Sequence, residues 1–300
     1  MPDKIVAIVV TYHPEMGALS HLLDVLRYQV EQIVVVDNGS AVDMDGFLAG
    51  RDPQVHFLPL GNNLGVAMAQ NAGIAWARER GAEYILLFDQ DSAPAPDMIE
   101  RLVEAAEATA AQGYTVAAVG PRYLDVRQDK PAPLIRVRGL QVKRCACTEP
   151  DAIVPVDYLI SSGCLIPMAT LGVVGDMTEE LFIDYVDIEW GLRAKSFGYQ
   201  SFGVCNASMG HSLGEHSINI FGRKIPLHSP LRHYYHFRNA VWLYRQPWPP
   251  LNWKLTDAWR LLLKYGFYTL FAPPRLKHLR MMTLGLWHGL CGRMRQFDNV

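Results

Sequence analysis

The chain has 300 residues, of which 50% are hydrophobic and 19% are charged, with a net charge of −2. This composition excludes a disordered chain, and no apolar run reaches the roughly 18 to 20 residues that span a membrane as a helix. The first residues are not a signal peptide, because their apolar run is short and ends in polar turn residues. We therefore expect one large domain, or one domain with an appendage.

Runs rich in Val, Ile and Leu alternate with helical stretches through the first 125 residues. The pattern predicts strands at 4–12, 31–40, 54–60, 83–91 and 115–124, and helices at 17–29, 62–81 and 96–112. Strands that alternate with helices are typical of βαβ units and a mainly parallel sheet. Nearly continuous apolar strands also indicate that both faces of the sheet are buried.

The second half of the chain is less regular. Residues 125–152 are polar and contain three prolines, which is typical of a variable excursion. From about Ile218 aromatic and basic residues dominate, and helices are predicted at 232–245, 254–271 and 275–295. The five cysteines are scattered without the spacing of a zinc ribbon or a redox motif, so we expect free thiols in a reducing cytosol.

The charge is divided unevenly along the chain. Residues 1–222 carry a net charge of −13 and residues 223–300 a net charge of +11, with only Asp257 and Asp298 as acidic residues in the second part. This division favours a C-terminal part that meets something anionic: a membrane surface, a phosphorylated substrate or nucleic acid. A solvated basic helical face is the alternative.

Polar residues follow three of the predicted strands. Thr11 and Tyr12 end the first strand, residues 37–40 (Asp-Asn-Gly-Ser) end the second, and residues 89–91 (Asp-Gln-Asp) end the fourth. The carboxyl ends of parallel strands meet at one edge of a sheet, where ligands bind, so we expect these residues to form one site. A helix that begins near Asn63 would add free backbone N–H groups suited to an anion.

Asp89 and Asp91 lie on the same side of the fourth strand, because Gln90 between them points the other way. Two adjacent carboxylates repel each other, and a divalent cation relieves that repulsion. Mg²⁺ and Mn²⁺ suit such a pair when substrate phosphates complete the coordination. By itself the pair is a weak signal, because two turn aspartates can also cap a following helix.

Taken together, these motifs resemble the family 2 glycosyltransferases of the GT-A fold over roughly residues 4–215. The stretches "FDQDS", "FIDYVDIEWGLRA" and "YYHFRNAVWL" are similar to the branch that uses dTDP-L-rhamnose. The resemblance implies a Rossmann-like α/β catalytic domain at 1–217, holding donor and metal. It also implies a basic, aromatic helical C-terminal region at 218–300, for acceptor or membrane contact.

The resemblance also assigns roles to individual residues. It implies a metal site for Mg²⁺ or Mn²⁺ made by Asp89, Asp91 and, after the last strand of the core, His211. It implies a binding site for the sugar nucleotide whose members are Thr11, Tyr12, Asp37, Asn38, Asn63, Gly65, Asn71, Asp89, Gln90 and Arg238. Arg232 and Arg238 on one helix would contact the diphosphate of donor or acceptor.

An inverting transferase needs a base to deprotonate the acceptor hydroxyl. Anchored on Arg193-Ala194, the family pattern places Asp187 at the base position, with Asp184 as the alternative because Val186 stands where the pattern usually has Glu. Glu189 and Arg193 are spaced to form a surface ion pair on one helix.

The resemblance implies an inverting, metal-dependent rhamnosyltransferase of bacterial surface glycan synthesis. Its partners would be a dTDP-sugar and a saccharide acceptor linked to a polyprenyl diphosphate. It would lie peripherally on the cytoplasmic face of the inner membrane through its C-terminal helices, although packing against the catalytic domain or a homodimer partner would explain the same helices.

Three other functions are open. The donor could instead be UDP-galactofuranose or UDP-N-acetylglucosamine. A nucleotidyltransferase is disfavoured, because the first strand lacks a glycine-rich basic phosphate loop after it. A non-catalytic glycan- or nucleic-acid-binding module is permitted by the basic C-terminal part. The acidic core argues against a nucleic-acid groove, so no nucleic-acid partner is expected.

Overall fold

The computed structural model describes residues 4–125, 130–131, 134–211, 216–220 and 223–297. Its centre is a sheet in the order β10-β12-β6-β11-β4-β1-β2-β3, with two short strands at its margins. The bounds are β1 (Ile5–Thr11), β2 (Gln32–Asp37), β3 (Val55–Pro59), β4 (Tyr84–Asp89), β5 (Ala93–Pro94), β6 (Val116–Asp125), β7 (Lys130–Pro131), β10 (Ile153–Val156), β11 (Cys164–Pro167) and β12 (Gln200–His211).

The parallel part of the sheet is β4-β1-β2-β3, as the alternation of strands and helices predicts. The strand β11 lies antiparallel between β4 and β6, an insertion that the sequence pattern does not predict. It joins two groups of parallel strands into one sheet, because β6 also pairs in parallel with β12. The fold is therefore a mixed α/β sheet that is mostly parallel, with the GT-A-like arrangement that the sequence predicts.

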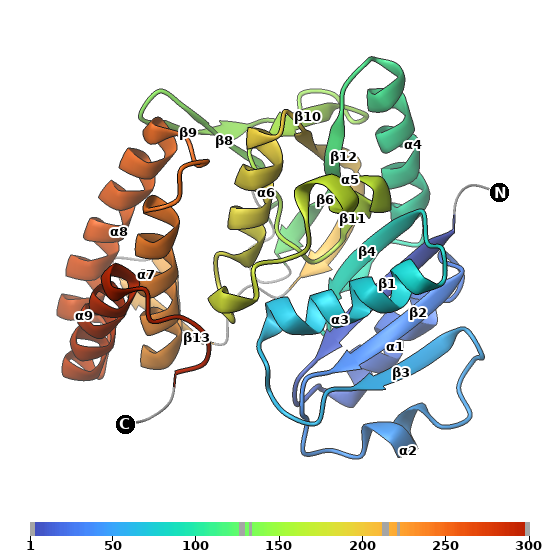
Figure 1. Ribbon diagram of the computed structural model, residues 1–300, viewed down its shortest axis with the longest axis horizontal. Helices are drawn as coiled ribbons and strands as arrows, with labels where there is room; N and C mark the ends of the chain where they lie inside the picture. The colour runs from blue at the N-terminus through green and yellow to red at the C-terminus, as the bar shows by residue number, and fades with distance from the viewer. Residues whose placement is uncertain (1–3, 126–129, 132–133, 212–215, 221–222, 298–300) are drawn as a thin grey trace.

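Helices cover both faces of the sheet (Figure 1). In β1, Ile5, Ala7 and Val9 pack under α1 (Met16–Leu26) and α4 (Met98–Ala111), together with α2 (Met44–Leu48). The alternate residues Val6 and Ile8 pack under α3 (Val66–Glu79), α5 (Met168–Val174) and α6 (Val186–Ser196). All five of these strand residues are at most 6% exposed, so the prediction of strands buried on both faces is confirmed.

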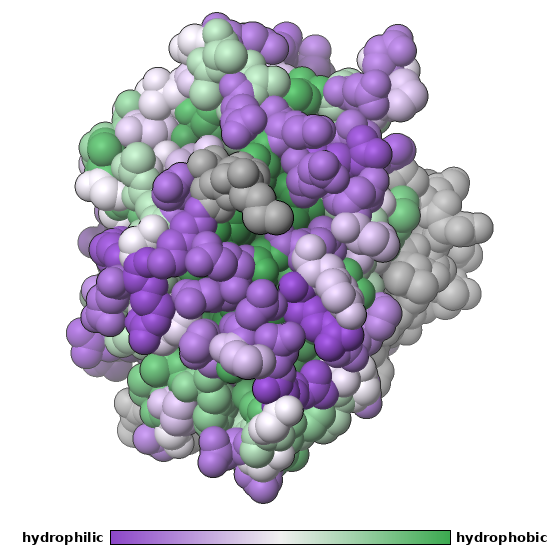
Figure 2. Space-filling model, turned by 90° about the vertical axis from the view of Figure 1, so that its right-hand side faces the viewer, coloured by the Kyte–Doolittle hydropathy of each residue, from purple (hydrophilic) through white to green (hydrophobic). Residues whose placement is uncertain are grey.

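Two hairpins stand apart from the central sheet, and three helices end the chain. The hairpins are β8 (Leu134–Arg138) with β9 (Gln141–Cys145) and β13 (His216–Ile220) with β14 (Arg223–Leu227). The helices α7 (Pro230–Tyr244), α8 (Leu251–Phe271) and α9 (Arg275–Cys291) lie side by side at the end of the molecule remote from β3 (Figure 1). The opposite side, toward α4 and β3, is mostly hydrophilic (Figure 2).

The three helices pack on the rest of the fold through a shared core. Tyr185 and Leu192 lie in one cluster with Phe237, Trp253 and Met282. Among the described residues, no helix is both long and apolar enough to cross a bilayer.

The expectation of five free thiols is wrong for one pair. Cys147 and Cys205 form a disulfide, with their Cα atoms 5.7 Å apart, whereas Cys145, Cys164 and Cys291 are free. The pair is 58 residues apart in sequence, so only the return of the chain along β12 brings the two sulfurs together. No local spacing could have indicated it.

Candidate active site

The three strand ends converge as predicted. In the sheet Thr11 pairs with Asp37, and Val10 pairs with Asp89, so the ends of β1, β2 and β4 lie in one row. This register brings the nucleotide-binding candidates and the acidic pair to the same edge. The physical reason is the parallel arrangement, in which equal strand lengths end at equal heights.

Asp37 is held by a closed network of donors. Its Oδ1 accepts from the Thr11 hydroxyl (2.9 Å) and from the Ser40 hydroxyl (2.5 Å), and its Oδ2 accepts from the backbone N–H groups of Ser40 (2.9 Å) and Gly39 (3.2 Å). The carboxylate is only 5% exposed, and these four bonds offset its desolvation. Thr11 is fully buried, so its hydroxyl orients Asp37 and does not itself line an open site.

Gln90 connects two strand ends. Its Oε1 accepts from the Tyr12 backbone N–H (2.7 Å) and its Nε2 donates to the Tyr12 carbonyl (3.2 Å). The side chain thus pairs with the backbone of Tyr12 as a neighbouring strand would. Gln90 was predicted to contact the donor, but its amide is used to fix Tyr12, whose own ring is 44% exposed beside the site.

Asn38 and Asn63 shape the turn before α3. Asn38 Nδ2 donates to Asn63 Oδ1 (3.1 Å), which also accepts from the Gly65 N–H (3.1 Å), and Asn38 Oδ1 accepts from the Leu64 N–H (2.8 Å). Gly65 has φ +92°, and a Cβ there would lie 2.6 Å from Phe182, so only glycine fits. For this reason α3 begins at Val66 and not at residue 62.

The same turn corrects one prediction. The N–H groups of Leu64 and Gly65 are bound by Asn38 and Asn63, and the Val66 N–H donates to the Phe182 carbonyl (2.7 Å). These three groups are therefore not free for an anion, contrary to the expectation. The sequence could not show this, because Phe182 arrives from a segment more than a hundred residues away.

The acidic pair sits on a braced loop. Ser162 accepts from the Asp89 N–H (3.2 Å) and bonds to the Ser92 hydroxyl (2.6 Å). Directly after the loop, Ala93 and Pro94 of β5 pair with Gly210 and Met209 of β12. His211 is the next residue of β12, so the backbone brings it to the level of Ser92, beside the acidic pair; its side chain lies outside the described residues.

The acidic loop suits a hard cation. Across the part of the chain that the structure describes, no three His, Cys, Asp or Glu side chains come together as a complete metal site. Asp89 is half-buried and Asp91 is exposed, which leaves a two-carboxylate platform open to solvent. Mg²⁺ and Mn²⁺ bind proteins in this way, through one or two carboxylates plus substrate phosphates, so the residues fit the expected ion.

Asp187 lies in the first turn of α6, and its carboxyl is buried. Burial raises the pKa of Asp187 to about 6, the bond from the Ile188 N–H (2.8 Å) opposes the rise, and repulsion by Asp184 and Asp89 adds to it. The charge of Asp89 thus acts on Asp187 in the same direction as burial. A carboxyl with a pKa near neutrality is suited to proton transfer at physiological pH.

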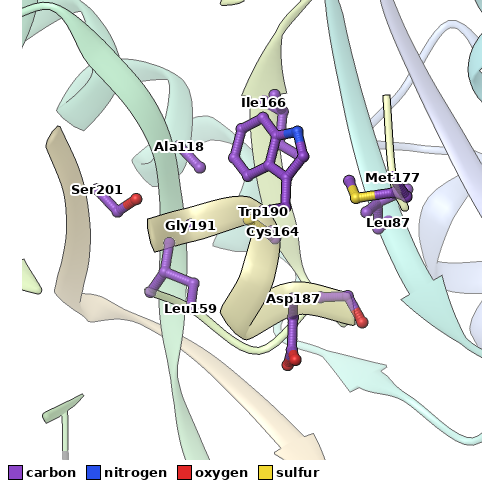
Figure 3. Close-up of a pocket in the computed structure, with 11 residues that line it drawn as sticks. Leu87, Ala118, Leu159, Cys164, Ile166, Met177, Asp187, Trp190, Gly191 and Ser201 are labelled. Carbon is purple, nitrogen blue, oxygen red and sulfur yellow. The ribbon is translucent and has the colours of Figure 1, made fainter. Parts of the chain in front are cut away.

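An apolar cavity adjoins Asp187 (Figure 3). It holds about 20 Å³, room for roughly one water molecule and far too little for a sugar. Its walls include Leu87, Cys164, Met177 and Trp190, and burial raises the pKa of the Cys164 thiol, which stays protonated. The cavity therefore provides an apolar environment beside the Asp187 carboxyl and is not a substrate pocket.

Asp184 and Glu189, the other acidic residues of this segment, have partners. Asp184 accepts from Arg232 Nε (3.3 Å), which favours Asp187 as the base. Glu189 is fully buried, binds Arg193 (2.8 Å) and accepts from the Thr178 hydroxyl (2.9 Å). The predicted Glu189–Arg193 pair thus exists, but it lies in the interior and not on the surface.

Comparison with known proteins places this geometry in a family. The sequence pattern of "Glycosyl transferase family 2" matches residues 7–149. The chain is also 37% identical over 294 residues to "dTDP-rhamnosyl transferase RfbF" of Shigella flexneri, covering 97% of both chains. The chain belongs to glycosyl transferase family 2.

Further relatives of this family 2 transferase are more distant. It is 28% identical to an "N-acetylglucosaminyl-diphospho-decaprenol L-rhamnosyltransferase" of Mycobacterium tuberculosis, over 86% of this chain and 91% of the relative. It is 25% identical to "Galactofuranosyltransferase GlfT1" of Mycolicibacterium smegmatis, over 92% and 93%. Its fold matches S. aureus TarS 1-349 in complex with UDP-GlcNAc, with a TM-score of 0.60, 15% identity and coverage of 99% and 94%.

Two predicted donor contacts of the family 2 transferase are used internally. Arg238 is fully buried and donates to Asn239 Oδ1 and to the carbonyls of Glu180, Leu181 and Arg295. The predicted contact of Arg238 with a diphosphate is therefore wrong. Asn71 donates to the Met177 carbonyl and to Glu179 (both 2.9 Å), so both of its amide hydrogens are used in bracing the loop before α6.

The segment before Asp187 is strained, and hydrogen bonds from other elements hold it in place. Phe182, Asp184 and Tyr185 have positive φ values of 65°, 62° and 65° without being glycine. Asn239 Nδ2 donates to the carbonyls of Leu181 (2.9 Å), Ile183 (2.7 Å) and Asp184 (2.9 Å). The helix α7 thereby fixes the backbone of η1 (Glu179–Leu181) and the turn that leads to Asp187.

A second clamp comes from α8. Asp257 Oδ2 accepts from the hydroxyls of Tyr185 and Tyr244, both at 2.7 Å. Sequence reasoning assigned no role to Asn239, Asp257 or Ser162. One feature of the sequence could have indicated a role for Asp257: it is the only acidic residue between Ser217 and Asp298.

Proposed function

We propose that this family 2 transferase moves L-rhamnose from dTDP-β-L-rhamnose to a saccharide acceptor, with inversion at the anomeric carbon and with Mg²⁺ or Mn²⁺. The observation that carries the proposal is Asp187 itself, a buried carboxyl in the first turn of α6 whose pKa is about 6 and whose charge is repelled by Asp89 at the end of β4. This is the pairing of a base and a diphosphate-binding edge that a single displacement requires.

In the proposed reaction Asp187 takes the proton of the acceptor hydroxyl. The acceptor oxygen bonds to the anomeric carbon while the bond from that carbon to the diphosphate oxygen breaks, and dTDP leaves with the electron pair. Attack from the side of Asp187, opposite the diphosphate, converts a β-linked donor into an α-linked product. When bound, the metal ion neutralises charge that develops on the diphosphate.

In this proposal the residues at the strand ends bind the sugar nucleotide and the metal ion. Asp37, fixed by Thr11 and Ser40, would recognise the nucleobase of the donor, and the exposed Tyr12 would lie against that nucleobase. Asp89, Asp91 and His211 would hold the metal ion. Asn63 and Gly65 would line the sugar-nucleotide side through the shape of their turn, and Asn38 and Gln90 would maintain that shape.

The similarity to RfbF over nearly the whole chain supports dTDP-rhamnose as the donor. The similarity to GlfT1 favours a second candidate, a UDP-galactofuranose donor, at lower identity. The name of the mycobacterial rhamnosyltransferase supports a polyprenyl-diphosphate-linked acceptor. We propose accordingly that the enzyme works peripherally at the cytoplasmic face of the inner membrane, with residues 1–217 for catalysis and 218–300 for the acceptor.

A thermal-shift panel tests donor and metal together. The purified protein is heated with dTDP-rhamnose, dTDP, UDP-galactofuranose or UDP-N-acetylglucosamine, each with Mn²⁺ or with EDTA. We expect stabilisation by the dTDP compounds that depends on Mn²⁺, because a ligand that binds only the folded state raises the melting temperature. Equal or greater stabilisation by a UDP-sugar would refute the rhamnosyl assignment.

The acidic loop is tested with a matched pair of variants. Asp91→Asn should abolish the Mn²⁺-dependent part of the shift. Asp97→Asn, which removes an exposed carboxylate six residues further on that pairs only with Arg101 at the surface, should leave it intact. If both variants retain the shift, Asp91 is not a metal ligand.

A further inference from the structure

The outward face of α8 is apolar over its whole length. Leu251, Leu255, Trp259, Leu262, Leu263 and Leu270 are each between 53% and 70% exposed. At the 100° per residue of an α-helix these six side chains fall within one arc of about 120°. An exposed, contiguous apolar stripe of this kind marks an interaction surface.

The charged residues of α8 lie outside that arc, and most have inward partners. Asp257 binds Tyr185 and Tyr244, Lys264 donates to His236 (2.9 Å), and Lys254 donates to the Gln246 carbonyl (2.5 Å). Arg260 is exposed on the flank of the stripe. Asp257, Lys254 and Lys264 thus have partners within the protein, whereas the six large apolar side chains of the stripe are exposed.

The helix α9 packs against α8 and also exposes large apolar and basic side chains. We refer to the exposed residues of the two helices as the α8–α9 surface. Leu276, Trp287 and Leu290 are between 59% and 80% exposed, and Arg275, Lys277 and Arg280 are exposed as well. No acidic residue occurs in α9. The α8–α9 surface thus combines large apolar side chains and tryptophans with basic residues, the composition of a helix that lies in a membrane interface. The surface is at the end of the molecule remote from β3 (Figure 1).

We infer that the α8–α9 surface docks on a bilayer that contains anionic lipids, with the leucines and Trp259 among the acyl chains and the basic residues at the headgroups. This inference rests on the proposed function, because docking on the bilayer would bring the enzyme to a lipid-linked acceptor. Charge complementarity selects the occupant: the exposed cations of α9, a helix without acidic residues, match an anionic surface. A symmetric dimer through the same face would set like charges against each other.

Docking through α8 would bring the bilayer surface close to Asp187, the proposed catalytic base. The inward side of α8 holds Tyr185 through Asp257, and Tyr185 is two residues from Asp187. An α-helix with its side chains is about 10 to 12 Å across, so the bilayer surface would lie about one helix diameter from the segment that carries the base. A saccharide attached to a membrane-anchored diphosphate could then reach Asp187 without leaving the membrane surface.

Vesicle co-sedimentation tests this surface directly. The full chain is mixed with vesicles of phosphatidylcholine alone or with 30% phosphatidylglycerol. Leu255→Glu is compared with Val173→Glu on α5, because these positions have nearly equal exposure, 53% and 55%. We expect the wild type and Val173→Glu to sediment with the anionic vesicles, and Leu255→Glu to bind at least tenfold more weakly. A second variant, Lys277→Glu with Arg280→Glu, should lose the preference for phosphatidylglycerol.

Three outcomes would overturn the inference. One is the absence of wild-type binding to either vesicle, and another is an equal loss in Val173→Glu. The third is a dimer in light scattering that Leu255→Glu dissociates, which would assign the face to a second copy. Melting temperatures check that each variant is folded. The catalytically inactive Asp187→Asn should still bind vesicles, so failure of the proposed reaction and failure of the docking surface are distinguishable.

Discussion

Asp187 occupies a place in which its charged form is unfavourable. It lines an apolar cavity and is repelled by Asp184 and Asp89, and backbone N–H groups, among them that of Ile188, only partly offset this. The folded protein therefore binds the proton of this carboxyl more tightly than the unfolded chain does. Stability consequently falls as the pH rises from about 4 to about 6 and stays lower above that range.

Replacement of Asp187 by asparagine should separate stability from activity. Asparagine keeps the shape and the bond to Ile188 but carries no charge, so at pH 8 the variant should be more stable by up to about 3 kcal/mol. At pH 4 the difference should vanish. Urea denaturation at both pH values measures this, while glycosyl transfer should fall by a factor of about 10² to 10⁴. A variant that is less stable than the wild type at pH 8 would contradict this account of Asp187.

The same carboxyl should set the acidic limb of the pH–rate profile. Because the base acts in its ionised form, kcat/KM should fall tenfold per pH unit below about 6 and level off above it. Asp184→Asn removes one of the repelling carboxylates, so its limb should move to lower pH. A limb that stays in place in that variant would show that Asp184 does not act on the base.

At the scale of elements, the segment from Glu179 to Tyr185 joins the parts of the site. Phe182 receives the first N–H of α3, Asn239 of α7 binds three of the segment's carbonyls, and Asp257 of α8 binds Tyr185. Three residues with positive φ are held in place by these contacts. The position of Asp187, the proposed base, therefore depends on helices outside the central sheet.

Two tyrosines offer a matched test of this dependence. Tyr185→Phe and Tyr244→Phe each remove one hydrogen bond of 2.7 Å to the same oxygen of Asp257. Both should lower the free energy of unfolding by a similar amount, about 1 to 3 kcal/mol. Only Tyr185→Phe should also lower kcat and shift the acidic limb, because only Tyr185 adjoins the base. Equal kinetic effects in both variants would show a purely structural role.

The sequence predicted the elements whose signals are local. Apolar runs, turn residues and parallel alternation located β1, β2 and β4, and therefore the row formed by Thr11, Asp37 and Asp89. The sequence could not show which polar side chains form hydrogen bonds with backbone groups that are distant in sequence. Gln90 binds Tyr12, and Arg238 binds carbonyls near residue 181, over separations of 78 and 57 residues. Such partners depend on the topology, including the antiparallel insertion of β11.

At the scale of the whole molecule, the acidic catalytic part and the basic helical part are joined by a common core. Tyr185 and Leu192 pack with Phe237, Trp253 and Met282, and the buried Arg238 lies across the junction. The proposed boundary at residues 217 and 218 therefore does not separate two independently packed cores.

This packing predicts one unfolding transition in calorimetry. Because α7 supplies buried partners to the base segment, neither part can expose that junction without leaving polar groups unpaired. Trp253, which is 3% exposed in the shared core, provides the test. Trp253→Ala should lower the single melting temperature, at a cost of about 3 to 5 kcal/mol, without splitting the transition. The exposed Trp287→Ala should leave the melting temperature nearly unchanged. Two separate transitions in the wild type, with only one of them moved by Trp253→Ala, would show that the C-terminal helices fold independently of the sheet.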